Sequence, residues 1–224
     1  MTQLNWTVLG AGTAVPHPTR SASGHLVTFG DTRLLVDMGA GTLWRLSAAG
    51  VDWTSLDGII ISHAHLDHTL DLQSLMFASK IPGHGRVRPL PIMAGAGMQA
   101  YIDRFAQALG SWFTPKGFEV IWSSHGSETV MVGPLKVTFG KVKHHETSVG
   151  IRVEAPTGDV VAYSGDSEPC EALERLCNGA SVAVLECSTR SCNPVAGHMT
   201  PAQVGAFLTC VDVERVVLVH RYPE

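Results

Sequence analysis

One short motif, His63-x-His65-x-Asp67-His68, carries the strongest chemical signal in the sequence. It follows directly on the apolar stretch of residues 58–62, which predicts a buried strand. Because side chains alternate along an extended chain, His63 and His65 project to one side and can converge on one metal ion. Asp67 and His68 lie just before the next predicted helix, where the chain turns them toward a second ion. Three imidazoles and a carboxylate at this spacing indicate a metal site rather than core packing.

A site for two ions needs further ligands, and these are expected at the ends of other strands. His144 and the neighbouring His145 precede the apolar run 150–153, Asp166 follows the run 160–163, and His220 ends the run 215–219. A side chain next to a buried strand is held rigidly, as a metal ligand must be. From position alone each has an ordinary alternative, a solvated loop histidine or a turn aspartate. Together they supply the number of ligands that a two-ion site requires.

The elements that would position these residues form a mixed pattern of strands and helices. Strands are predicted at residues 6–9, 25–29, 33–36, 58–61, 90–93, 118–122, 135–139, 150–153, 160–163, 182–185 and 215–219. Helices are predicted at residues 41–49, 70–79, 98–109, 170–177 and 201–208. The early part runs mostly strand to strand and the later part alternates, which favours an α/β fold: a four-layer αββα sandwich of two mixed β-sheets flanked by helices. With 224 residues, 45% of them hydrophobic, a single domain spanning 1–224 is expected.

The start of the last predicted helix is unusually well marked. Thr200 is suited to the N-cap, Pro201 to the first helical position and Gln203 to the reciprocal position of a capping box. This places His198 in the loop before the helix, where its side chain can point into a cleft.

Composition narrows the possible partners and compartment. The net charge of −4 gives no general attraction to polyanions such as nucleic acid. Five cysteines, all in the last quarter and without a CxxC pair, favour neither a disulfide framework nor a structural zinc knot. The N-terminus lacks the pattern of a signal peptide, and no apolar run is long enough to span a membrane. We therefore expect a cytoplasmic protein without membrane association.

The order of the ligands resembles that of the metallo-β-lactamase superfamily: His63-x-His65-x-Asp67-His68, then His144, Asp166 and His220. Three further segments, LGAGTAVP at 9–16, LLVDMGAGT at 34–42 and GHMT at 197–200, resemble its tRNA 3′-processing branch, the ribonuclease Z-like phosphodiesterases. The similarity extends from about residue 5 to the C-terminus. The histidine motif is highly specific, whereas the glycine-rich opening alone would be weak.

The resemblance implies a role for each residue of the site. One ion is assigned His63, His65 and His144, and the other Asp67, His68 and His220, with Asp166 bridging the two. In the family the third histidine stands six residues before a glycine, here Gly150, which favours His144 over His145.

A mechanism follows from the same resemblance. The resemblance implies two ions that would lower the pKa of a water molecule and polarise a phosphodiester. Asp67 serves as general base as well as ligand, and His198 as general acid supported by Glu186. Asp37 is expected to orient a ligand, although a simple turn aspartate is nearly as good an account of it.

The sequence departs from the tRNA-processing enzymes in two respects. Their His-Glu-Ala-Thr stretch is represented only by Leu185-Glu186-Cys187-Ser188, and their tRNA-binding arm is missing. Their flexible arm, which grips tRNA, is inserted between the third-histidine region and the later strands, and the spacing around Asp166 leaves no room for it. We therefore expect the partner to be a small phosphodiester or nucleotide, such as a cyclic nucleotide or short oligonucleotide, with RNA less favoured. The alternatives are a lactone or carboxylic ester hydrolase on the same site, a ribonuclease Z-type RNA endonuclease, and a non-catalytic metal-binding module.

The ligand types also bear on the cofactor. Histidine-rich nitrogen and oxygen ligation suits two divalent ions, with Zn²⁺ favoured and Mn²⁺ or Fe²⁺ as alternatives. A homodimer is left open, because no helical seam in the sequence decides it.

Overall fold

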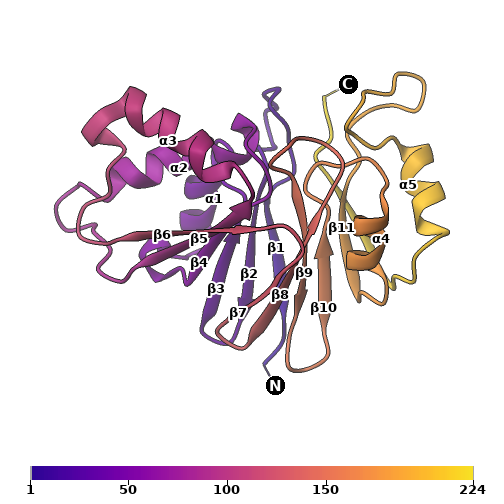
Figure 1. Ribbon diagram of the computed structural model, residues 1–224, viewed down its shortest axis with the longest axis horizontal. Helices are drawn as coiled ribbons and strands as arrows, with labels where there is room; N and C mark the ends of the chain where they lie inside the picture. The colour runs from indigo at the N-terminus through magenta and orange to yellow at the C-terminus, as the bar shows by residue number, and fades with distance from the viewer. Residues whose placement is uncertain (1, 224) are drawn as a thin grey trace.

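The computed structural model describes residues 2–223 and shows two β-sheets packed face to face with helices on both outer faces (Figure 1). The first sheet has the order β1-β2-β3-β4-β5-β6, and the second has the order β12-β11-β10-β9-β8-β7. Strands β3 to β6 run parallel to one another, as do β10 to β12, while the other pairs are antiparallel. The expected αββα sandwich is confirmed.

The strands of the first sheet are β1 Asn5–Gly10, β2 Gly24–Phe29, β3 Thr32–Val36, β4 Gly58–Ile61, β5 Leu90–Gly95 and β6 Val120–His125. Those of the second sheet are β7 Thr129–Val132, β8 Leu135–Lys141, β9 Val149–Glu154, β10 Val160–Tyr163, β11 Val182–Glu186 and β12 Val216–Val219. The helices are α1 Thr42–Ala48, α2 Leu66–Ala78, α3 Met98–Leu109, α4 Glu171–Cys177 and α5 Pro201–Leu208, with short 3₁₀ turns η1 Trp53–Ser55 and η2 Gly110–Trp112. No helix of the described residues is both long and apolar enough to span a bilayer.

Strand β4 shows how the layers are built, since every one of its residues is buried. Ile60 points into the core between the sheets, where it joins Phe139 and Ile151 from the second sheet. Ile59 and Ile61 point the other way, into the core that the first sheet shares with α2. A strand buried on both faces has a continuous apolar sequence, which is why residues 58–61 lack polar alternation.

Helix α2 begins at Leu66, four residues earlier than the sequence pattern predicts, so Asp67 and His68 lie within its first turn. The buried side of that turn is formed by His68 and Thr69, while Leu66 and Leu70 are exposed. Apolar periodicity therefore gives no sign of the first turn. The capping box at Thr200 and Gln203 is confirmed at the start of α5.

The carboxyl ends of the parallel strands meet at one edge of the sandwich. Asp37 follows β3, His63 follows β4, and Asp166 follows β10. Glu186 ends β11 and His220 follows β12. This edge is where α/β sheets place their functional groups, and it gathers the residues of the site.

Candidate metal centre

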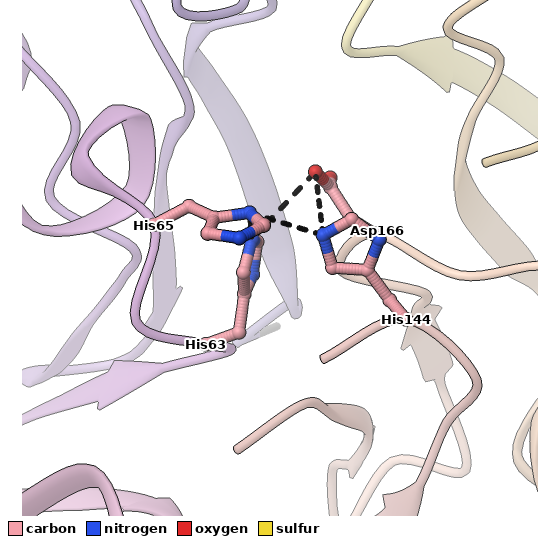
Figure 2. A group of neighbouring side chains, drawn as sticks. All are labelled: His63, His65, His144 and Asp166. Atoms are coloured by element: carbon pink, nitrogen blue, oxygen red, sulfur yellow. Dashed lines mark hydrogen bonds and ion pairs between the residues drawn. The ribbon is translucent and has the colours of Figure 1, made fainter. Parts of the chain in front are cut away.

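A first cluster of ligand atoms joins the loop after β4 to the ends of β8 and β10 (Figure 2). His63 Nε2 lies 3.0 Å from His65 Nδ1, which lies 3.1 Å from His144 Nε2. Asp166 Oδ2 lies 3.7 Å from the Nε2 atom of His63 and 3.8 Å from that of His144. Nitrogen and oxygen atoms that converge this closely on one point can hold a metal ion.

A second cluster lies beside the first and is formed by Asp67, His68 and His220. His220 Nε2 lies 3.1 Å from Asp67 Oδ2 and 3.4 Å from Asp166 Oδ2. The other carboxylate oxygen, Asp166 Oδ1, lies 3.4 Å from His68 Nε2. Asp166 therefore contacts both clusters, and the structure brings together every ligand that the sequence predicts.

The donor set fits divalent metal ions. His68 Nε2 and Asp166 Oδ1 are buried and have no hydrogen-bond partner among residues 2–223, although they lie 3.4 Å apart across the site. A buried polar atom without a partner is costly, and metal coordination is one way to satisfy it. Imidazole nitrogens with carboxylate oxygens are ordinary ligands of zinc and of other divalent transition metals.

The pKa shifts of His63 and Asp166 favour the deprotonated forms that bind metal, whereas that of His68 favours the protonated form. Burial and the nearby His68 hold the pKa of His63 well below its ordinary value. Burial raises the pKa of Asp166, but His220 and His68 bring it well below its ordinary value. Burial lowers the pKa of His68, but Asp166 and Asp37 raise it well above its ordinary value. Metal binding is therefore expected to displace a proton from His68 Nε2, since a ligating imidazole nitrogen must be deprotonated.

Asp37 supports ligands of both clusters from behind. Its Oδ2 atom accepts hydrogen bonds of 2.7 Å from His68 Nδ1 and 2.9 Å from the Ser62 hydroxyl, which itself lies 3.1 Å from His63 Nδ1. Tyr163 donates a third hydrogen bond to the same oxygen, and the backbone N–H of Ser62 donates to Oδ1. Such contacts fix the orientation and tautomer of a ligating imidazole.

Ser62 and Tyr163 were not identified from the sequence as part of the site. Ser62 directly follows the apolar strand β4, and Tyr163 is the last residue of the apolar strand β10. Both carry a hydroxyl group and both are buried. A buried hydroxyl at the end of an apolar run next to a ligand is the signal that could have identified them.

A histidine–glutamate pair lies against the ligand clusters. Fully buried Glu186 accepts a 3.0 Å hydrogen bond from His198 Nδ1 and is held in place by the backbone N–H groups of Ser167 and Met199. The His198 ring lies 4.7 Å from that of His144, and its Nδ1 lies 3.9 Å from Asp166 Oδ2. Burial lowers the pKa of His198, but the Glu186 hydrogen bond and the surrounding carboxylates raise it above its ordinary value.

Gly197 couples the His198 loop to the first cluster. Its carbonyl oxygen lies 2.8 Å from His144 Nδ1, so His144 donates there and presents Nε2 to the cluster. A Cβ atom at Gly197 would lie 2.7 Å from that nitrogen, and its φ of 87° also favours glycine. By contrast, His145 lies outside the ligand groups and contacts Thr147 instead.

The segment after His144 contains no long insertion in the described part of the chain. Strands β9 and β10 follow it directly, and only a short segment with α4 separates Asp166 from β11. The structure thus agrees with the expectation that this chain lacks the arm of the tRNA-processing enzymes.

Comparison with known proteins identifies the family. Residues 32–221 match the model of the beta-lactamase superfamily domain. Ribonuclease Z of Mycobacterium bovis is 29% identical over 202 residues, which cover 81% of this chain and 69% of that protein. An uncharacterized protein of Mycobacterium tuberculosis is 32% identical over 228 residues, which cover 97% of this chain and 80% of that protein.

Solved structures show the same fold. The metallo-beta-lactamase fold protein YhfI of Bacillus subtilis has a TM-score of 0.83 at 27% identity and covers 99% of this chain, with 87% of its own chain matched. The short form of human tRNase Z has a TM-score of 0.81 at 21% identity, covering 97% of this chain and 92% of its own. The chain therefore belongs to the beta-lactamase superfamily and is a metal-dependent hydrolase of that family.

Proposed function

We propose that this hydrolase is a phosphodiesterase that acts on a small phosphodiester or nucleotide with two divalent metal ions bound. The first cluster, His63, His65 and His144, would hold one ion. The second, Asp67, His68 and His220, would hold the other, and Asp166 would bridge them. Zinc is the favoured metal for this nitrogen-rich set of ligands. We also propose that residues 1–224 form one domain.

Two divalent ions bound at this site would polarise a phosphoryl oxygen and lower the pKa of a water molecule. The chain's own groups would handle protons around them. Asp67 Oδ2, at the mouth of the second cluster and 3.1 Å from His220 Nε2, is placed to orient the attacking water and accept its proton. Burial raises the pKa of Asp67, but its hydrogen bond with His220 brings the pKa below its ordinary value, so the carboxylate is ionised.

The observation that carries the proposal is the His198–Glu186 pair. Because Nδ1 donates to the Glu186 carboxylate, protonation of the ring places the second proton on Nε2. Burial lowers the pKa of His198, but the hydrogen bond with Glu186 raises it, which favours the protonated ring. An alkoxide leaves a phosphodiester as a strong base, and a buried acid beside the ligand clusters supplies the proton it needs.

Two features favour a small substrate. The described chain has no inserted arm between His144 and β11, since only a short segment with α4 separates Asp166 from that strand, and the net charge is −4. The relative named ribonuclease Z supports phosphodiester chemistry, and cleavage of RNA is the alternative within that chemistry. Hydrolysis of a lactone or carboxylic ester is the second alternative, because a two-metal site also attacks carbonyl groups.

The proposal is tested by metal content and hydrolysis measured on the same preparations. Metal-reconstituted wild type is expected to hold two ions per chain and to hydrolyse bis(p-nitrophenyl) phosphate. His63→Ala is expected to lose both metal and activity, whereas the control His84→Ala, which changes an exposed histidine outside the ligand clusters, is expected to keep both. Full activity in His63→Ala would overturn the assignment of the site.

A further inference from the structure

His145 lies beside the first cluster without belonging to it. It stands in the short turn between β8 and β9, directly after the ligand His144. Its ring centroid lies 5.2 Å from that of His65, in a tilted arrangement, and its side chain is partly exposed. An imidazole at the rim of the site can reach a molecule bound there.

The turn that carries His145 is tightly held. The His145 N–H donates to the Ser148 hydroxyl at 3.0 Å, and the Ser148 N–H donates back to the His145 carbonyl at 3.0 Å. The Ala64 N–H, between two of the ligands, donates to Thr147 Oγ1 at 3.1 Å. On the other side, the backbone of Thr147 packs so closely on Gly95 that a Cβ there would lie 2.0 Å from the Thr147 carbonyl oxygen.

The same turn fixes the tautomer of His145. The Thr147 backbone N–H, which can only donate, points at His145 Nδ1 with a distance of 3.3 Å. The Thr147 hydroxyl lies 3.0 Å from the same nitrogen. Nδ1 is therefore an acceptor, and the proton of the neutral ring is on Nε2. Within residues 2–223, no hydrogen-bond partner is found for that Nε2–H.

His145 and His198 occupy different sides of the ligand clusters. The His198 ring lies near His144 and His220, at 4.7 and 5.7 Å between centroids. His145 contacts the ring of His65 instead. Two hydrogen-bonding imidazoles on different sides would meet different parts of one substrate.

We propose that His145 is a substrate-binding residue whose Nε2–H donates to a non-bridging oxygen of the phosphoryl group, away from the leaving group. This rests on the proposed phosphodiesterase function. The neutral ring suffices for the contact, because Nε2 carries its proton in that form. Since hydrogen bonds to charged groups are the stronger ones, the contact favours an anionic phosphoryl group over a neutral ester.

Three variants test this role: His145→Ala, His145→Gln and the control His84→Ala. All are assayed for metal content, for KM and kcat on a series of aryl phosphodiesters, and for the inhibition constant of inorganic phosphate. His145→Ala is expected to keep two ions per chain. Its KM and its phosphate inhibition constant are expected to rise by roughly 10- to 100-fold. His145→Gln, whose amide can donate in place of Nε2–H, is expected to recover part of the loss.

The loss in His145→Ala is expected to be the same for good and poor leaving groups. Loss of metal would overturn the proposal and make His145 a ligand. Unchanged KM and phosphate inhibition would overturn it as well, as would a loss that grows with the leaving-group pKa. If wild type hydrolyses no phosphodiester, the proposed function fails separately, and calorimetric binding of phosphate to the metal-loaded variants still decides the role of His145.

Discussion

The Tyr163 hydroxyl donates a 2.7 Å hydrogen bond to Asp37 Oδ2, across 126 positions of the sequence. Asp37 leaves the end of β3 in the first sheet, and Tyr163 ends β10 in the second. Both side chains are buried, and the same carboxylate oxygen accepts from the ligand His68. The two halves of the sandwich therefore meet directly behind the metal ligands.

This relationship predicts an effect of Tyr163→Phe on metal binding. The change keeps the ring in the core but removes one of the donors that hold Asp37, so His68 becomes less firmly oriented. We expect the affinity for the metal ion held by Asp67, His68 and His220 to fall by roughly tenfold. Competition with a chromophoric chelator measures it. Tyr101→Phe, on α3 and away from the site, is the matched control, and equal affinities in the two variants would contradict the prediction.

Removal of His198 is expected to separate metal binding from proton donation. His198 lies within metal-binding distance of Asp166 and His220, but its Nδ1 donates to Glu186, so His198→Ala should keep both ions on the other ligands. Its activity should fall by roughly 100- to 10,000-fold on phosphodiesters with poor leaving groups. It should fall far less on aryl phosphodiesters, because their leaving groups need no proton. The slope of log kcat/KM against leaving-group pKa measures this difference. An unchanged slope relative to wild type would show that His198 is not the acid.

The buried His25 predicts a pH dependence of stability. Burial lowers its pKa from 6.5 to about 4, with Asp37 opposing the shift. Between these values the unfolded chain binds the proton and the folded chain does not, so the free energy of unfolding decreases as the pH falls from 6.5 toward 4. At pH 4.5 His25 alone should account for a loss of about 2–3 kcal/mol relative to neutral pH.

The variant that isolates this effect is His25→Asn. His25 Nδ1 accepts a 3.2 Å hydrogen bond from the Trp6 indole, and the asparagine oxygen can accept it without titrating. Urea unfolding of the metal-free proteins at pH 7 and pH 4.5 should show a smaller loss in His25→Asn than in wild type. Parallel losses in the two proteins would assign the pH dependence to other groups.

Gly39 predicts a steric requirement at the start of α2. A Cβ atom there would lie 2.0 Å from the carbonyl oxygen of Asp67, in the first turn of that helix. Gly39→Ala should therefore displace the turn that carries Asp67 and His68, weaken metal binding, and lower Tm by about 5–10 °C. Gly205→Ala in α5 meets no atom within 4 Å and should raise Tm by about 2–4 °C. Scanning calorimetry measures the Tm of both variants. Equal Tm values for Gly39→Ala and Gly205→Ala would contradict the prediction.

Much of the fold and of the ligand set could be predicted from local sequence. The parallel strands β10 and β12 are short continuous apolar runs, and Asp166 and His220 follow them, so the pattern predicted that both lie at strand ends. The start of α2 could not be predicted in this way, because His68 and Thr69 form its buried face. Strand β7 was also missed, because its residues are only partly buried or exposed.

The contacts that orient the predicted metal ligands could not be predicted from the sequence, for a different reason. Tyr163 and Asp37 have no local pattern in common, and only the packing of the two sheets brings them together. The role of Thr147 behind His145 similarly depends on Ala64, 83 positions away. Ligands have a characteristic residue type and spacing, whereas the groups that orient them are defined by tertiary structure.

The central claim is that this site cleaves phosphodiesters, and one rate ratio tests it most directly. Metal-reconstituted protein of measured metal content should be assayed side by side on bis(p-nitrophenyl) phosphate and on an acyl lactone. The proposed site predicts a higher kcat/KM for the phosphodiester than for the lactone. Efficient lactone hydrolysis with no phosphodiester hydrolysis, in protein that holds two ions per chain, would contradict it.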